Sequence, residues 1–118
     1  MNELTVTRPD VAKEIAVETD EPGTTIVHCL YDQPSLCRLW PAHMCIIQDN
    51  GDKRRLVHSE GIALHPYWDY TSRFTLVFEG LAKSCSSFYL FEDIPESGAF
   101  KSATMQRNKT DVYTWKMQ

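Results

Sequence analysis

Residues 44–57 read MCIIQDNGDKRRLV, two β-prone runs on either side of a polar turn. The turn DNGD contains no apolar residue, whereas residues 44–48 and the stretch after Lys53 do. The pair Asn50-Gly51 readily supplies the two positive φ angles of a tight hairpin turn. The stretch therefore predicts an antiparallel β-hairpin, and it is the strongest local structural signal in the chain.

Two strands with alternating apolar residues are predicted downstream of this hairpin. Residues 73–79 and 87–92 both alternate with the period of two that is typical of a half-buried strand. The side chains expected to face the core are Phe74, Leu76 and Phe78 in the first stretch and Phe88 and Leu90 in the second.

Two more strands complete the predicted central part of the fold. Residues 24–31 are rich in β-branched and aromatic types, and the composition of residues 32–35 predicts a turn that ends the strand. Residues 111–115 predict a last strand, in which Tyr113 and Trp115 share a face.

The N-terminal region predicts further short strands. Residues 4–7 alternate and stop at Pro9, and residues 15–19 alternate before a turn, although the residues just before them also favour a helix. Seven or eight short strands with little helical periodicity indicate an all-β fold over residues 1–118 as one domain. We expect an antiparallel immunoglobulin-like β-sandwich, with a small β-barrel as the alternative.

Length and charge limit the classes of function. A chain of 118 residues is a common size for one domain, and its formal net charge of −4 argues against nucleic-acid binding. The basic run at residues 53–55 is expected to be solvated at the hairpin tip. No stretch approaches the roughly 18 apolar residues of a membrane span, and the N-terminus has no signal-peptide pattern. A cytoplasmic location is favoured; a periplasmic or exported one would need a signal peptide.

Cysteine and histidine residues in the first half of the chain are the candidates for a metal site. They are His28, Cys29, Cys37, His43 and Cys45. Zinc binds four thiolate or imidazole ligands, but structural zinc sites use close pairs, whereas these cysteines are eight residues apart. Packing in the core is the preferred interpretation, so no metal or other cofactor is predicted.

Catalytic signatures are also missing from the sequence. There is no C-x-x-C, G-x-S-x-G, H-E-x-x-H or phosphate-binding glycine loop. Glu92, Asp93 and Glu96 crowd a predicted turn, which is typical of solvated charge. No catalytic residue is predicted, and a Cys/His enzyme is the weakest of the functional hypotheses.

Aromatic residues supply the candidate partner-binding surface. Tyr67, Trp68 and Tyr70 lie in an apparent loop, residues 65–70, which we expect beside Trp40. Exposed Tyr and Trp side chains are favoured anchors for protein partners. The alternative is that Trp40 and Trp68 fold back and cap an open end of the sandwich.

Two stretches carry a resemblance to a known group of proteins. Residues 56–64, LVHSEGIAL, and residues 73–92, RFTLVFEGLAKSCSSFYLFE, resemble β-sandwich domains that accompany thioredoxin-like modules in bacterial thiol-disulfide proteins. Similar stand-alone bacterial proteins have no known function. The resemblance implies a sandwich fold and a bacterial origin. The redox activity of such proteins belongs to a C-x-x-C module that this chain lacks, so no catalytic residue carries over.

The leading hypothesis is a non-catalytic β-domain that binds a protein partner or supports assembly. A small-ligand or metal-sensing domain is the alternative from another class. The sequence indicates neither the identity of the partner nor the oligomeric state.

Overall fold

The computed structural model describes residues 23–117, so the strands expected at residues 4–7 and 15–19 lie outside the described residues. Seven strands and one short 3-10 helical turn make up this part of the chain. They are β1 (Thr24–Cys37), η1 (Pro41–His43), β2 (Met44–Gln48), β3 (Lys53–Glu60), β4 (Asp69–Glu79), β5 (Ser87–Glu92), β6 (Met105–Gln106) and β7 (Val112–Met117).

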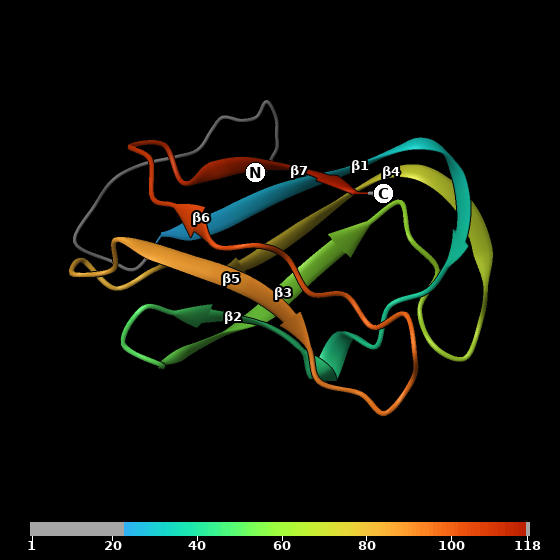
Figure 1. Ribbon diagram of the computed structural model, residues 1–118, viewed down its shortest axis with the longest axis horizontal. Helices are drawn as coiled ribbons and strands as arrows, with labels where there is room; N and C mark the ends of the chain where they lie inside the picture. The colour runs from blue at the N-terminus through green and yellow to red at the C-terminus, as the bar shows by residue number, and fades with distance from the viewer. Residues whose placement is uncertain (1–22, 118) are drawn as a thin grey trace.

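The seven strands form one curled sheet in the order β6-β5-β2-β3-β4-β1-β7 (Figure 1). The prediction of an all-β fold is confirmed, and the sheet has the shape of a half-barrel. The expected immunoglobulin-like sandwich is not confirmed, whereas the barrel alternative fits. The expectation of purely antiparallel pairing is wrong, because β1 and β7 pair in parallel.

One strand, β3, explains why the sheet is continuous. The first residues of β3 pair with β2, with Arg55 opposite Cys45. Its later residues pair with β4, with Leu56 opposite Phe78, and the register shifts just beyond this pair. A strand that pairs on both sides along different parts of its length bends the sheet instead of dividing it into two layers.

The concave side of the sheet encloses one hydrophobic core. Phe74, Leu76 and Phe78 are at most 3% exposed, which confirms the core face predicted for this strand, and Phe88 and Leu90 are buried as well. The other buried apolar side chains are Val27, Cys29, Cys37, Leu39, Met44, Ile46, Leu81, Cys85, Phe100, Tyr113 and Met117. The prediction that Tyr113 and Trp115 share a face is also confirmed, since both contact this core.

The hairpin between β2 and β3 is confirmed, with a different turn from the one predicted. Within this turn, only Gly51 has a positive φ, of 92°. The Gln48 backbone N–H donates to the Asp52 carbonyl at 2.8 Å, and the Gly51 N–H donates to the Gln48 carbonyl at 2.8 Å. This is the three-residue loop in which a type I turn is followed by a left-handed glycine, so one positive φ is sufficient.

The predicted turn at residues 32–35 is wrong, because β1 continues through it to Cys37. Leu30 pairs with Arg73 and Ser35 pairs with Thr71, so residues 31–34 lie opposite Ser72 alone. This bulge absorbs the turn-forming residues and bends the strand. Beyond it, β1 and β4 run on together as a two-stranded arm, which curves away from the other strands at the right of Figure 1.

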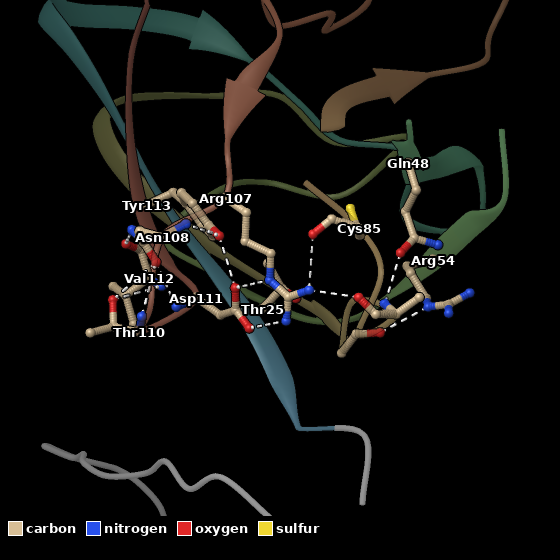
Figure 2. A network of polar contacts seen from close by, with 12 residues as sticks. Thr25, Gln48, Arg54, Cys85, Arg107, Asn108, Thr110, Asp111, Val112 and Tyr113 are labelled. Carbon is tan, nitrogen blue, oxygen red and sulfur yellow. Dashed lines mark hydrogen bonds and ion pairs between the residues drawn. The ribbon is translucent and has the colours of Figure 1, made fainter. Parts of the chain in front are cut away.

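At the other end of the molecule, Arg107 connects the turn before β7 to the β4–β5 connection (Figure 2). Its Nε and Nη2 donate to the two carboxylate oxygens of Asp111 at 3.1 and 3.0 Å. Its Nη1 donates to the carbonyls of Ala82 and Cys85 at 2.6 and 3.2 Å. The Asp111 side chain also accepts from the Tyr113 hydroxyl at 2.8 Å. We call this set of contacts the Arg107 clasp.

Two further side chains fix the same connection from the opposite half of the sheet. The Gln48 Oε1 accepts from the Ala82 backbone N–H at 2.8 Å, and the Arg54 Nε donates to the Gly80 carbonyl at 2.8 Å. Gln48 is 3% exposed, so its amide needs this partner. The β4–β5 connection is therefore held from β2, from β3 and from the turn before β7, and these contacts maintain the curl of the sheet.

Replacing Arg107 should destabilise the whole domain. Arg107→Ala leaves the Asp111 carboxylate and two partly buried carbonyls without their donor, so we expect a loss of about 2–3 kcal/mol in the free energy of unfolding. Arg107→Lys should lose less, because an ammonium keeps the charge but not the forked geometry. Urea unfolding measures both. Lys109→Ala, in the same turn and exposed, is the matched control and should change stability by less than about 0.5 kcal/mol.

Candidate functional site

The outer part of the two-stranded arm exposes a small cluster of large side chains. Leu36 and Tyr70 are cross-strand partners and so lie on the same face. Arg38 follows Leu36 by two residues, and Trp68 precedes Tyr70 by two residues. The Arg38 guanidinium carbon is 4.2 Å from the centre of the Trp68 ring. The exposed fractions are 52% for Leu36, 53% for Trp68 and 66% for Tyr70. We call Leu36, Trp68 and Tyr70 the arm face, and Arg38 lies against it.

Arg38 holds the arm face in place. Its side chain is only 13% exposed, forms an ion pair with Glu96, and donates from Nη1 to the Pro66 carbonyl at 3.1 Å. The guanidinium contacts Trp68 on one side and lies 5.9 Å from the Trp40 ring. Stacking of a guanidinium on an indole is favourable and restricts the ring. One face of Trp68 is therefore occupied while the side chain as a whole stays half exposed.

The structure separates the four aromatic residues that the sequence put forward. Trp40 is half-buried and stacks on His65 with ring centres 3.9 Å apart, so residues 65–70 do lie beside it. Trp68 and Tyr70 stand on the arm face, and Tyr67 is 73% exposed. Of the two tryptophans that were expected to cap an open end of the sandwich in the alternative, Trp68 stays 53% exposed. Tyr70 belongs to β4 and not to a loop.

A buried carboxylate supports the segment that carries Arg38 and Trp40. Glu92 is 2% exposed, and it accepts the backbone N–H of Trp40 at 2.9 Å and that of Phe100 at 3.0 Å. The expectation that Glu92 is a solvated turn charge is therefore wrong. Burial raises the pKa of Glu92, although the two N–H donors oppose the shift. Alternation within residues 87–92 places Glu92 on the core face with Phe88 and Leu90, and this signal could have identified it.

The candidate metal ligands do not come together. His28 and Cys29 are neighbours in β1 and lie on opposite faces, with His28 exposed and Cys29 buried. Cys37 is buried at the arm, and His43 is exposed in η1 with its ring edge against Trp40. Cys45 is half-buried in β2. Within residues 23–117, no three side chains of the types His, Cys, Asp and Glu are grouped as a metal site would require.

Three of the four cysteine thiols contact backbone carbonyls, and the fourth, Cys37, is hydrogen-bonded to the Tyr31 side chain. Cys29, Cys45 and Cys85 direct their sulfur atoms to the carbonyls of Val27, Phe91 and Ser87 at 3.9, 3.6 and 3.2 Å. Burial raises the pKa of Cys29 to about 12 and also raises the pKa of Cys37 and of Cys45. A nucleophilic thiolate needs the opposite shift. These environments are those of packing residues.

An open groove of about 600 Å³ lies on the outer side of the sheet. Its lining residues are His28, Leu30, Glu60, Gly61, Arg73, Phe74, Thr75 and Thr114. His28 shares a hydrogen bond of 2.9 Å with the Thr75 hydroxyl, and burial together with the nearby Arg73 charge lowers the pKa of His28. The groove is the place where the small-ligand alternative would have to be tested, but its side chains do not surround a common point as in an enclosed pocket.

Comparison with known protein families, curated proteins and solved structures finds no match for this chain. Among residues 23–117, none of the helical structure has the length and hydropathy of a membrane span.

Cys29 should be inert toward alkylation in the folded protein. A pKa of about 12 lowers the thiolate fraction at neutral pH by roughly a thousandfold relative to a thiol with pKa 9, and burial adds a steric block. Iodoacetamide labelling at pH 7.5, followed by peptide mass spectrometry, should leave Cys29 unmodified while urea-unfolded protein is labelled at all positions. Rapid labelling of Cys29 in the folded state would revive the hypothesis of a catalytic cysteine.

Glu92→Gln should lower the free energy of unfolding at pH 7 by about 1–3 kcal/mol, because the new amide N–H₂ meets one of the two backbone N–H donors. The folded-state pKa of Glu92 is raised above the ordinary value of 4.5, so the folded protein binds the proton more tightly than the unfolded chain does. Wild-type stability should therefore fall as the pH rises through the window above 4.5, relative to the variant.

Urea unfolding between pH 4.5 and 7 measures this difference. The advantage of the wild type over Glu92→Gln should widen as the pH falls. Asp93→Asn changes the next carboxylate along the chain, which is exposed, and is the matched control. A gap that narrows on acidification would contradict the raised pKa.

Proposed function

We propose that this domain is a non-catalytic module that binds a protein partner through the arm face. The observation that carries the proposal is the half to two-thirds exposure of Trp68 and Tyr70 on a well-supported two-stranded arm. Large aromatic side chains are normally buried, and exposed ones that are held rigid are favoured as binding anchors because they lose little conformational entropy on binding.

The support beneath the arm face favours binding over a purely structural role. The Arg38 guanidinium stacks on one face of Trp68 and is itself fixed by Glu96 and by the Pro66 carbonyl. Glu92 anchors the backbone at Trp40, two residues farther along the chain. A surface that is preorganised in this way binds without first having to order its own side chains.

The resemblance of residues 56–64 and 73–92 to bacterial domains that accompany thioredoxin-like modules fits this proposal, since such domains assemble with other modules. An immunoglobulin-like relationship and a bacterial origin are part of the proposal and rest on that resemblance.

The test is selection from a phage-displayed library of random peptides on the immobilised protein, followed by fluorescence polarisation with the selected peptides. We expect Trp68→Ala to weaken binding at least tenfold, because a central aromatic anchor is removed. Val57→Ala is the matched control: Val57 is 57% exposed but lies on β3, so its loss should change binding less than twofold.

Urea midpoints of both variants should match the wild type, which separates lost contact from lost fold. Selected peptides whose binding survives Trp68→Ala but is lost in Arg73→Ala would move the binding site to the outer groove and overturn the proposal.

A further inference from the structure

The arm face is too small to hold a globular partner by itself. Strands in a sheet are about 4.8 Å apart, so a two-stranded ribbon is only about 10 Å wide. With 53% of Trp68, 66% of Tyr70 and 52% of Leu36 exposed, the apolar area offered is on the order of 300 Å². A standard interface buries about 800 Å² on each partner. The face therefore suits a short extended segment rather than a second copy of this chain.

Addition of a β-strand to the arm is disfavoured by its own side chains. The Tyr70 backbone N–H donates to the Asp69 carboxylate at 2.8 Å, and the Thr71 hydroxyl donates to the Arg73 carbonyl at 2.8 Å. On β1, Pro34 has no N–H, and the Ser35 hydroxyl donates to the Gln33 carbonyl at 3.2 Å. Local contacts of this kind compete with the regular ladder that a new strand needs.

The chemistry of the face selects for an uncharged, apolar ring. Arg38 is already neutralised by Glu96, so it does not require an acidic ligand. Arg38 covers one face of the Trp68 indole, so the other face can contact a ligand. The Tyr70 hydroxyl can donate a hydrogen bond to a peptide carbonyl. A proline ring packs flat on an aromatic ring, and a polyproline II segment keeps its carbonyls free and loses little entropy when it binds.

Spacing permits the same ligand. Trp68 and Tyr70 are two residues apart, about 6.6 Å along an extended chain. A polyproline II helix has three residues per turn and rises about 3.1 Å per residue, so prolines two positions apart are about 6.2 Å apart along the axis and lie on two neighbouring edges of the helix. One side of the helix therefore presents two prolyl rings, one for Trp68 and one for Tyr70.

We propose that the arm face docks a proline-rich segment of the partner in the polyproline II conformation, with prolyl rings against Trp68 and Tyr70. This inference rests on the proposed function and specifies the chemistry of its ligand.

The probe is an uncharged decaproline peptide titrated into the full chain, with the indole N–H resonances followed by NMR. The Trp68 resonance should shift and saturate with a dissociation constant between about 10 μM and 1 mM, the range of weak peptide docking. A Gly/Ser decapeptide and a Thr/Val decapeptide should produce no saturable shift. No saturation at millimolar decaproline, or equal binding of the Thr/Val peptide, would overturn the inference.

Variants locate the binding and separate the two proposals. Isothermal titration calorimetry measures the variants, because Trp68→Ala and Trp68→Phe both lack the Trp68 indole resonance. Trp68→Ala should weaken decaproline binding at least tenfold, Trp68→Phe should restore part of it, and Val57→Ala should leave it within twofold. Loss of binding in Trp68→Ala without recovery in Trp68→Phe, at unchanged urea midpoints, would contradict ring stacking. If decaproline fails while library-selected peptides still require Trp68, the polyproline inference is wrong and the proposed function stands. If neither binds, both fail.

Discussion

The Arg107 clasp is the constraint on which the curl of the sheet depends. One guanidinium binds the Asp111 carboxylate through two nitrogens and reaches the carbonyls of Ala82 and Cys85 through the third. It thereby ties the turn before β7, at one edge of the sheet, to the connection between β4 and β5 (Figure 2). The pairing of β3 with both β2 and β4 bends the sheet, and the clasp holds that bend by joining two segments that are not neighbouring strands.

At the opposite end of the molecule, the buried Glu92 carboxylate holds two backbone segments together. Glu92 replaces missing backbone partners for Trp40 and Phe100 in a region where the chain leaves the sheet. Because the carboxylate is buried, its contacts are strong only while both donors stay in place. The segment from Arg38 to Trp40 is thus fixed from the core side, and the arm projects from a rigid base. Within residues 23–117, the Arg107 clasp lies at one end of the domain, and the exposed Trp68 and Tyr70 lie on the arm at the other end.

Rigidity is what links this architecture to a binding role. An exposed tryptophan on a loose loop would lose much of its binding energy to ordering, whereas Trp68 is restrained by Arg38 before any ligand arrives. The thiols and histidines carry no comparable arrangement within residues 23–117. Cys29, Cys45 and Cys85 face backbone carbonyls, and His28 and Cys29 lie on opposite sides of one strand. The restrained tryptophan is therefore the feature on which the proposed binding role rests.

Residues 73–79 and 87–92 specify their own strands and core faces, because alternation along an extended chain is a local property: Phe74, Leu76 and Phe78 had to share a side. It also placed the hairpin at Gly51. Contacts between distant segments set the parallel pairing of β1 with β7, the sharing of β3 between β2 and β4, and the arm that continues through a predicted turn. These depend on partners distant in sequence, and so do the two backbone N–H donors of Glu92 and the stacking of Arg38 on Trp68. No local pattern records which distant group will satisfy a charge.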